Sequence, residues 1–372
     1  MTSPINLELA IVIPTYNERE NISLLLAVLD VALTGLAWET VVVDDNSPDG
    51  TAQHVREVAR RDLRVRVLER IGRRNLSSAC IEGILATSAP YIAVMDGDFQ
   101  HDEKMLPRML HLAKEKSLDI VVATRRASGG SMGEIPGHRL RLSNLGTSLS
   151  RRICHCDVSD PMSGFFLVDR VFFQSVVHKL TGSGFKILVD LLASSSRPVR
   201  IAEVPYHFRP RTRGQSKLDL HVELEYLYLI VDKIFGHYLP TRFVLFIFVG
   251  TFGLVLHLSA LGILYYLCNQ SFATAQIVAT GLAMTLNFML NNIVTFRDHR
   301  PRGTNLILGL LGYYAACSLG VLINISFASA LLRKSIPWYI AGLAGMAISS
   351  VWNYGVNIVL TWKRNTSADQ WR

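Results

Sequence analysis

Two aspartates one residue apart, Asp96 and Asp98, end an apolar run in the segment YIAVMDGDFQH at residues 91–101. A buried parallel strand reads as a near-continuous apolar run, and ligands in open α/β sheets gather at the carboxyl ends of such strands. Alternate residues of an extended segment point the same way, so both carboxylates can converge on one hard cation, with the amide oxygen of Gln100 beside them. The alternative is a plain turn, since Asp-Gly is a common turn dipeptide. The motif alone leaves a Mg²⁺ or Mn²⁺ site and a turn equally open.

Two upstream segments have the same construction. The apolar run in LELAIVIPTYNERENI, residues 7–22, is expected to end at Pro14, which has no N–H for a strand ladder. The β-branched run in ETVVVDDNSPDGT, residues 39–51, ends in Asp44 and Asp45. Helical periodicity follows each run, which is the order of parallel βαβ units. Three consecutive strands are therefore expected to place these polar residues on one exposed rim: Tyr16, Glu18, Asp45, Asp96 and Asp98.

The rim offers carboxylates rather than a phosphate-binding loop. No Gly-rich loop follows the first strand, so neither a P-loop nor a dinucleotide fingerprint fits. Carboxylates can bind a base or the hydroxyls of a ribose, and they can also bind a metal. This combination indicates a nucleotide-sugar site. The segment RTRGQSKL at 211–218 adds Arg211 and Lys217, whose side chains suit phosphate oxygens. A solvated loop or a basic strip near lipid headgroups is the alternative for this segment.

These segments carry a resemblance to a known family. PTYNE at 14–18, VVVDDNSPDGT at 41–51 and DGDFQH at 96–101 resemble glycosyltransferase family 2, whose catalytic domain has the α/β GT-A fold, a Rossmann-like, mostly parallel sheet. RTRGQSKL resembles the basic motif of the dolichyl- or polyprenyl-phosphate mannose synthases. The similarity runs from residue 8 to residue 225. One departure is the segment RIGRRNLSSACIEGI at 70–84, where relatives usually carry a Gly-rich stretch.

The resemblance implies roles for individual residues. It implies that the nucleoside of GDP-mannose is held by Pro14, Tyr16, Glu18, Val43 and Asp45. It implies that the metal and the diphosphate are held by Asp96, Gly97, Asp98 and Gln100, with Asp96, Asp98 and Gln100 as metal ligands. It implies that the donor or its phosphates contact the cationic residues Arg125, Arg211 and Lys217. Asp98, Arg211 and Lys217 are then the expected catalytic residues.

The implied reaction is transfer of mannose from GDP-mannose to dolichyl or polyprenyl phosphate. A phosphate monoester has a second pKa of about 6 and is already nucleophilic at neutral pH, so no catalytic base is needed. Asp160, in the segment DPMSGFFLVDR, would then orient the acceptor or a loop. A single displacement inverts the anomeric carbon and gives a β-linked product. Two alternatives stay open: glucose transfer from UDP-glucose, and a lipid-linked sugar translocase whose soluble part only binds nucleotide.

The C-terminal third predicts a membrane domain. Four apolar stretches, at 243–268, 272–296, 306–332 and 336–362, each meet the length of about 20 residues that a bilayer span needs. Their layout, with NNIVTFR at 291–297, is similar to the GtrA-like membrane family. The segment 219–241 predicts an amphipathic helix in the membrane interface, with packing on the soluble core as the alternative. The expected parts are a catalytic domain at 1–218, the interface helix at 219–241, an all-α four-helix membrane domain at 242–364 and a tail at 365–372.

Charge placement predicts the orientation. Basic residues flank the first, second and fourth stretches on one side, so both termini and the catalytic domain are expected in the cytosol of a multi-pass membrane protein. The net charge of +8 suits anionic headgroups and phosphorylated substrates, and no nucleic-acid-binding module is present in the sequence. The five cysteines are too scattered for a disulfide framework.

Overall fold

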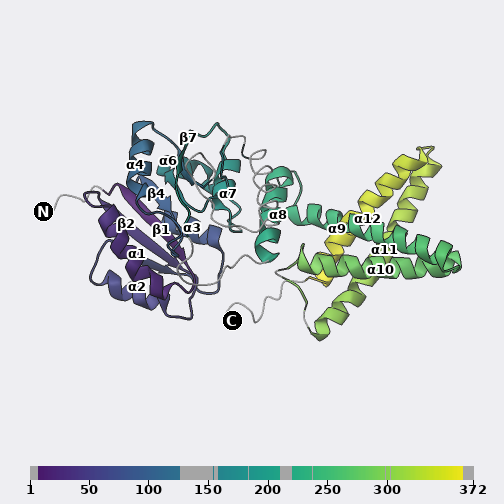
Figure 1. Cartoon of the computed structure of the whole chain (residues 1–372). Coiled ribbons are helices and arrows are strands. Elements are labelled where there is room, and N and C mark those ends of the chain that lie inside the picture. The colour runs from purple at the N-terminus through teal and green to yellow at the C-terminus, as the bar shows by residue number, and fades with distance from the viewer. Residues whose placement is uncertain are drawn as a thin grey trace. The chain divides into compact units, whose positions relative to one another are not determined.

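The computed structural model of the chain describes residues 7–125, 154, 158–182, 184–209, 220–236, 238–297, 299–301 and 303–362. The chain divides into two compact units, Met1–Ile234 and Phe235–Arg372 (Figure 1). The first unit combines strands and helices, and the described part of the second is helical. The predicted fold class, an α/β GT-A domain followed by helices of membrane length, is confirmed.

The first unit is organised around a seven-stranded sheet in the order β3-β2-β1-β4-β6-β5-β7. The strands are β1 Leu9–Thr15, β2 Trp38–Asp44, β3 Val65–Glu69, β4 Tyr91–Val94, β5 Ile120–Thr124, β6 Phe166–Asp169 and β7 Ile201–Pro205. β6 runs antiparallel to β4 and β5, whereas the other neighbouring pairs are parallel. Parallel neighbours follow from crossover connections, because each crossover returns the chain to the same edge of the sheet.

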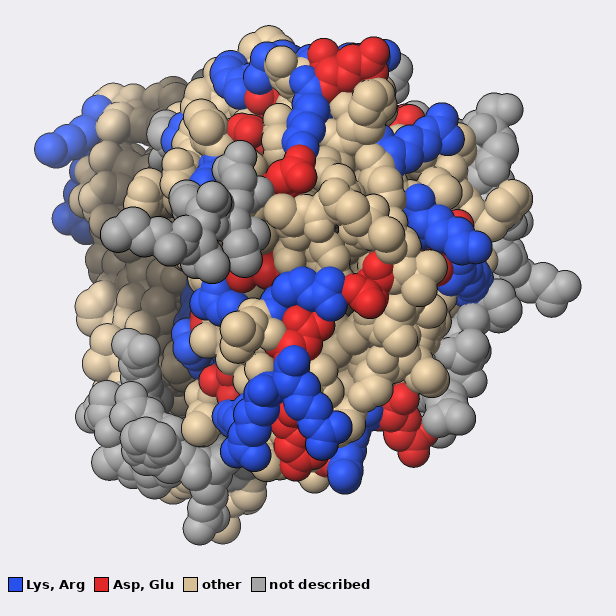
Figure 2. Space-filling model, turned by 90° about the vertical axis from the view of Figure 1, so that its left-hand side faces the viewer, with Lys and Arg blue, Asp and Glu red and all other residues tan. Residues whose placement is uncertain are grey.

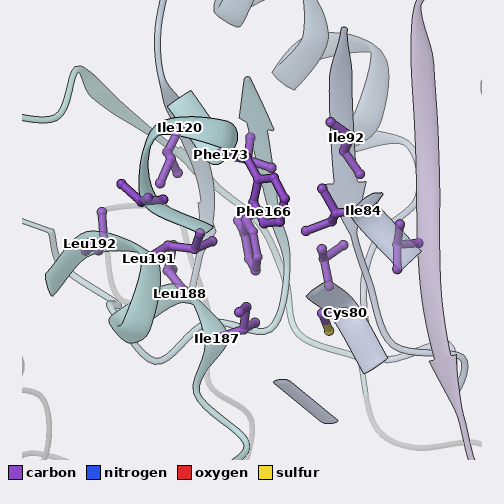
Figure 3. Packing of buried hydrophobic residues seen from close by; sticks show 14 of the residues in the cluster. Cys80, Ile84, Ile92, Ile120, Phe166, Phe173, Ile187, Leu188, Leu191 and Leu192 are labelled. Atoms are coloured by element: carbon purple, nitrogen blue, oxygen red, sulfur yellow. The ribbon is translucent and has the colours of Figure 1, made fainter. Parts of the chain in front are cut away.

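Helices cover both faces of the sheet, because each strand alternates its apolar side chains between two sides. In β1, Ala10 and Val12 belong to one core, while Leu9, Ile11 and Ile13 belong to the other. The first core is covered by α3 Leu76–Leu85, α6 Arg170–Val176, the 3₁₀ turn η1 Val177–Lys179 and α7 Ile187–Ala193 (Figure 3). The second core is covered by α1 Arg19–Ala32, α2 Thr51–Ala59 and α4 Met105–Glu115.

β1 passes through Pro14 and ends at Thr15, so the predicted end of the strand at proline is wrong. Pro14 stands opposite Val43 of β2, while the pairing of β1 with β4 has already ended at Val12. A residue without an N–H is tolerated where one neighbouring strand has left the ladder.

Helix α8 Leu220–Phe235 lies in the segment that was expected at the membrane interface. Leu229 and Ile230 are buried, and Leu229 belongs to the same core as the side chains of α7. Lys233 Nζ lies 2.6 Å from Asp190 Oδ1, a fully buried carboxylate of α7. One face of α8 therefore packs on the soluble core, which was the alternative. Ile234, at the end of the helix, is exposed.

Charged side chains of both signs intermingle on the described surface of the first unit that Figure 2 presents. The exposed ion pairs of this unit include Arg64 with Asp30 at 2.7 Å. Pairs of this kind contribute about 0–1 kcal/mol each, because water screens them. A mixed face does not create the field of one sign that attracts a polyanion.

In the described part of the second unit, four helices are long and apolar enough to cross a membrane, as predicted: Thr241–Leu267, Phe272–Ile293, Thr304–Arg333 and Ile340–Leu360. They correspond to α9 Thr241–Gly262 with the π-helical turn η2 Ile263–Leu267, α10 Phe272–Ile293, α11 Thr304–Arg333 and α12 Trp338–Leu360. Many of their apolar side chains are exposed, as expected of helices that face lipid.

Candidate active site

Three strand ends lie side by side at one edge of the sheet, and predicted site residues follow them. β2, β1 and β4 are neighbours, and Thr15 of β1 stands opposite Asp44 of β2. They are not consecutive in the chain, contrary to the prediction, because β3 comes between β2 and β4 and pairs on the far side of β2. The residues that follow the three strands are Tyr16 and Glu18, Asp45, and Asp96 with Asp98.

The two aspartates after β4 differ in exposure. Asp98 is only 4% exposed, which corrects the expectation that it lies on an exposed rim. Its Oδ1 accepts a hydrogen bond from Gln100 N at 3.2 Å, and this bond closes the turn. Phe99 has a φ of +65°, a left-handed conformation that is costly for a bulky residue and recurs at functional sites. The side chain of Asp96 is 40% exposed and is the more accessible of the two carboxylates.

His101 supports the Asp96 side of this turn. Its buried ring stacks on Phe165, with 5.0 Å between the ring centroids. Nδ1 accepts the backbone N–H of Asp96 at 3.1 Å, so the ring proton lies on Nε2, which is 3.7 Å from Asp96 Oδ2. Burial lowers the pKa of His101 to about 4, so the imidazole is neutral at pH 7. A Cβ at Gly164 would lie 3.4 Å from Asp96 Oδ2, so glycine leaves room for this carboxylate.

Arg125 and Asp160 form a bidentate ion pair. Arg125 Nε lies 2.8 Å from Asp160 Oδ2, and Arg125 Nη2 lies 3.2 Å from Asp160 Oδ1. The carboxylate is 1% exposed and the arginine side chain is 24% exposed. Burial alone would lower the pKa of Arg125, but the hydrogen bonds and charge of Asp160 raise it, and the charge of Asp96 adds to that effect. Asp160 is bound to a cation and is therefore poorly placed to act as a base.

Lys186, at the start of α7, belongs to the same group of charges and was not predicted from the sequence. Burial lowers its pKa, the charge of Arg125 lowers it further, and the charges of Asp160 and Asp96 oppose these effects. The segment GFK that carries it matches none of the patterns used above, so no sequence signal pointed to it.

A second ion pair, Asp45 with Arg70, lies at the end of β2. Arg70 is 1% exposed, and its Nη1 lies 3.0 Å from Asp45 Oδ1. The other carboxylate oxygen of Asp45 accepts the backbone N–H of Asn75 at 2.9 Å. Burial raises the pKa of Asp45, and the charge of Arg70 offsets this only in part. Arg70 was not predicted from the sequence, because it follows β3, a short strand of mixed polarity with the sequence VRVLE, and no motif marks it.

The loop that departs from the family pattern completes the surroundings of Arg70. Asn75 accepts the N–H of Ser78 at 3.2 Å and thereby caps helix α3. Its backbone carbonyl accepts from Arg70 Nη1 at 3.0 Å, and Ser78 Oγ accepts from Arg70 Nη2 at 2.6 Å. Gly83 lets α3 approach the sheet, because a Cβ there would lie 2.4 Å from Val12 Cγ1. The polar residues of this loop thus hold the buried arginine.

The remaining predicted residues are placed as follows. The guanidinium of Arg74 lies over the ring of Tyr16, with 3.4 Å between Cζ of the arginine and the centroid of the ring. Glu18 Oε2 accepts from Asn21 Nδ2 at 2.7 Å. The side chain of Val43 belongs to the core, so it cannot touch a ligand on the rim. Arg211 and Lys217, and with them the predicted basic loop, lie outside the described residues.

Comparison with known proteins identifies both units. The family model Glycosyl transferase family 2 matches residues 10–177, and the model GtrA/DPMS, transmembrane domain, matches residues 245–362. Among solved structures, glucosyl-3-phosphoglycerate synthase from Mycobacterium tuberculosis aligns with 61% of this chain and 78% of its own, at 19% identity and a TM-score of 0.47. A similarity this low adds nothing to the assignment.

Two relatives share the name dolichol-phosphate mannosyltransferase. The protein from Pyrococcus furiosus is 35% identical over 361 residues, which cover 96% of this chain and 99% of the relative. The protein from Saccharomyces cerevisiae is 30% identical over 274 residues, which cover 71% of this chain and 97% of the relative. The chain therefore belongs to the dolichol-phosphate mannosyltransferase family, as a family 2 glycosyltransferase with a C-terminal GtrA/DPMS transmembrane domain.

Proposed function

We propose that this enzyme transfers mannose from GDP-mannose to dolichyl or another polyisoprenyl phosphate, with inversion, and releases GDP. The observation that carries the proposal is the order of charges along the rim. Asp45 presents a carboxylate after β2, the aspartate turn follows β4, and Arg125 presents a guanidinium beside that turn. The near-full-length similarity to the dolichol-phosphate mannosyltransferase of Pyrococcus furiosus supports the sugar and the acceptor.

Asp45 would recognise the base of the donor. Guanine carries two neighbouring N–H donors on one edge, and a carboxylate can accept both, whereas uracil offers one. Arg70 and the N–H of Asn75 fix this carboxylate, so it meets the base in one orientation. The aromatic ring of Tyr16 lies at the end of the neighbouring strand and would stack on the base, with Pro14, Glu18 and the main chain of Val43 around the nucleoside. This arrangement favours GDP over UDP.

Asp96, Asp98 and Gln100 would hold a divalent metal, Mg²⁺ or Mn²⁺. Gln100 Nε2 donates to Arg209 O at 3.4 Å, which leaves the amide oxygen for a cation. The donor set is all oxygen and suits a hard ion. No cluster of three His, Cys, Asp or Glu side chains forms a metal site among the described residues, so the diphosphate, at Gly97, and water would complete the coordination. A bound ion would supply positive charge to the leaving diphosphate.

The acceptor phosphate needs positioning rather than deprotonation, because it is largely dianionic at pH 7. Arg125 was expected at the donor or its phosphates; we assign it to the acceptor phosphate, because its guanidinium can bind two phosphate oxygens while Asp160 fixes its plane. Holding this phosphate in line with the anomeric carbon supplies the proximity that the reaction requires. Arg211 and Lys217 would stabilise the negative charge that grows on the departing diphosphate.

The catalytic unit would lie in the cytosol, and the membrane helices would keep it at the surface where the lipid phosphate is found. The basic residues that flank α9, α10 and α12 support this orientation. Labelling of single cysteines introduced at Asn269 and at Gly303 in sealed vesicles tests it, since these loops should react from opposite sides. Labelling of both from one side would overturn the orientation.

One assay tests the reaction. Membranes that contain the chain are given dolichyl phosphate and either radiolabelled GDP-mannose or UDP-glucose, and the lipid phase is extracted and counted. We expect label in the lipid from GDP-mannose only, with transfer abolished by EDTA and restored by Mn²⁺ or Mg²⁺. Label from UDP-glucose would favour the glucosyltransferase alternative. Nucleotide binding without any lipid product would favour a translocase.

A further inference from the structure

The ends of α10 and α12 carry the same sequence pattern. Residues 287–297 read NFMLNNIVTFR and residues 353–363 read NYGVNIVLTWK. Asparagine, asparagine and threonine recur at intervals of four residues, and an aromatic and a basic residue follow each threonine. Nine of the eleven positions carry the same residue or one of the same kind, the exceptions being Met289 with Gly355 and Asn292 with Ile358, and the three shared polar residues are more than shared hydrophobicity requires.

The two patterns fold identically. The first asparagine of each accepts, through its backbone carbonyl, the side-chain amide of the second: Asn291 Nδ2 to Asn287 O at 2.9 Å, and Asn357 Nδ2 to Asn353 O at 2.7 Å. The threonine of each donates to the second asparagine: Thr295 Oγ1 to Asn291 Oδ1 and Thr361 Oγ1 to Asn357 Oδ1, both at 2.7 Å. The backbone N–H groups that follow also match, since Phe296 N bonds to Asn291 O and Trp362 N to Asn357 O.

The preceding helix contributes a matched glycine to each pattern. A Cβ at Gly253 of α9 would lie 2.3 Å from the amide of Asn287, and a Cβ at Gly320 of α11 would lie 2.2 Å from Oδ1 of Asn353. Each asparagine amide therefore packs on a bare glycine Cα, a contact that allows close approach of membrane helices. The two hairpins, α9–α10 and α11–α12, are thus closed by the same pair of residues.

Ring contacts between the two hairpins occur in equivalent pairs, so that a contact from α9 to α12 corresponds to a contact from α11 to α10. The rings of Phe246 in α9 and Tyr354 in α12 are 5.7 Å apart, and the equivalent rings of Tyr313 in α11 and Phe288 in α10 are also 5.7 Å apart. The Phe296–Tyr354 distance of 6.2 Å matches the Phe288–Trp362 distance of 5.9 Å. Phe296 and Trp362, which are equivalent to each other, stack at 4.2 Å. A contact that maps onto itself lies on a twofold axis.

We infer that the membrane unit consists of two copies of one helical hairpin, α9–α10 and α11–α12, related by a pseudo-twofold axis through the Phe296–Trp362 pair. The surface that joins them is self-complementary, so the partner that fits each hairpin is a second copy of that hairpin. Both hairpins enter the bilayer from the same side, and the axis therefore runs along the membrane normal.

Two polar contacts break the symmetry and select the partner. Trp362 Nε1 donates to Asn292 Oδ1 at 2.7 Å, but the equivalent residues, Phe296 and Ile358, cannot form this bond. If two α9–α10 hairpins of different chains were paired, each Asn292 would face a phenylalanine. If two α11–α12 hairpins were paired, each indole N–H would face an isoleucine. A buried polar group without a partner is costly, so the bond favours pairing of the two unlike hairpins.

The second polar contact also favours pairing of the two unlike hairpins. Tyr314 OH lies 2.8 Å from Thr285 Oγ1 and donates to Gly281 O at 2.7 Å, whereas Ile247 and Val351 occupy the equivalents of Tyr314 and Thr285. The chain thereby joins its own two hairpins instead of joining hairpins of two chains.

Thermal unfolding of the full chain in detergent tests the repeat. Gly253→Ala and Gly320→Ala should each lower Tm by about 5 °C and by similar amounts, because the new methyl group displaces an asparagine. Gly250→Ala and Gly342→Ala are the controls, since nothing lies within 4 Å of a Cβ at either position. They should leave Tm unchanged or raise it slightly, because alanine favours helix. Loss of stability at only one of the two matched glycines would overturn the equivalence.

Copies of the full chain with two different affinity tags test partner selection. In the double variant Asn292→Ile with Trp362→Phe, each position takes the residue of its counterpart, so this contact no longer favours unlike hairpins and only the Tyr314 contact still does. We expect this variant to remain folded and to co-purify with its differently tagged copy after co-expression, at least several-fold more than the unchanged chain does. Tyr314→Phe alone should give a smaller increase. Equal co-purification of the unchanged chain and the double variant would show that these contacts do not select the partner.

Discussion

The two ion pairs on the rim are built alike but present opposite charges. In the Asp45–Arg70 pair the guanidinium is 1% exposed and the carboxylate is the more exposed member, at 8%. In the Asp160–Arg125 pair the carboxylate is 1% exposed and the arginine is the more exposed member, at 24%. Each pair thus uses one deeply buried charge to hold its partner.

This difference matches the two ends of the proposed donor–acceptor complex. A fixed carboxylate accepts N–H groups and suits a base, whereas a fixed guanidinium fork suits phosphate. Neither charge could be buried alone, because an uncompensated ion in the interior costs several kcal/mol in practice, about 3–5 kcal/mol when one partner of a buried pair is removed. The buried partner therefore makes a preorganised charge possible on the rim, and its sign decides which substrate group binds there.

The largest expected effect is a loss of kcat, and it is expected at the Asp160–Arg125 pair. Arg125→Lys keeps the charge but removes the fork, and it should lower kcat by about 10²-fold while changing the KM for GDP-mannose little. The lysine keeps a partner for Asp160, so Tm should fall only modestly. Steady-state transfer to dolichyl phosphate and thermal unfolding measure both. A rise in donor KM without loss of kcat would place Arg125 on the donor side instead.

The variant Asp160→Asn tests whether Asp160 only positions Arg125 or acts as a catalytic base. If Asp160 only holds Arg125, the variant should lose less kcat than Arg125→Lys, because the amide oxygen still accepts one hydrogen bond. A catalytic base would give the opposite ranking, with Asp160→Asn the more damaging change. Measuring kcat for both variants in one preparation series decides between the two roles.

The carboxylate pair should control donor affinity rather than rate. Asp45→Asn removes the charged acceptor and should raise the KM for GDP-mannose by about 10–100-fold, which corresponds to the loss of one or two charge-assisted hydrogen bonds. Competition by GDP should weaken by the same factor, while competition by UDP should change much less. Equal losses for both nucleotides would mean that Asp45 binds the ribose and not the base.

The carboxylates at the strand ends could be predicted, because they depend on the pattern of one short segment. The residues that hold these carboxylates in place could not be predicted. Asp45, Asp96 and Asp98 each follow an apolar run, so the pattern of one segment places them at the edge of the sheet. Asp98 was expected to be exposed, but it is buried and precedes a left-handed residue, Phe99, and no local pattern indicates such a turn. Arg70, which pairs with Asp45, is brought to the rim only by tertiary packing.

The four spans show the same division between local and long-range information. Hydrophobic length alone predicted them, because a bilayer imposes that length on each helix separately. The hairpin repeat lies in a handful of polar and aromatic positions, such as Asn287 and Asn353, within otherwise variable apolar sequence. The spacing of these positions within one helix does not indicate a repeat, which is evident only from the matched contacts between helices.

A pH titration should separate the two pairs further. Burial raises the pKa of Asp45 above its ordinary value of 3.8, so the carboxylate is lost at a higher pH than usual as the solution is acidified. Guanine N–H groups need the ionised form, and the donor KM should therefore rise on the acid side. His101, whose pKa burial lowers to about 4, also takes up a proton in acid, and this would affect kcat rather than the donor KM. In Asp45→Asn the donor KM should stay flat over the range where the unchanged enzyme loses affinity. A parallel rise in both proteins would assign the titration to another group.

The smallest effect is expected at a third pair, which lies away from the rim. Asp119 is 1% exposed and precedes β5, so it lies at the opposite edge of the sheet from the site, with Arg197 2.7 Å and Arg200 2.9 Å away. Burial alone would raise the pKa of Asp119, but hydrogen bonds from the two arginines hold it well below its usual range. A carboxylate with a depressed pKa stabilises the fold fully above the unfolded pKa of about 3.8, and this contribution is lost as the pH falls below it.

Arg200→Ala should therefore leave kcat and KM unchanged and lower Tm by about 1–3 °C at pH 7, since both arginines are largely exposed and water screens their charge. The difference in Tm should shrink as the pH is lowered through the range in which Asp119 becomes protonated in the unfolded chain. Thermal unfolding of the two proteins across acidic pH measures this. If Arg200→Ala impaired transfer as much as Arg125→Lys does, the distinction between a rim pair that presents a charge to substrate and a pair that only holds strands together would fail.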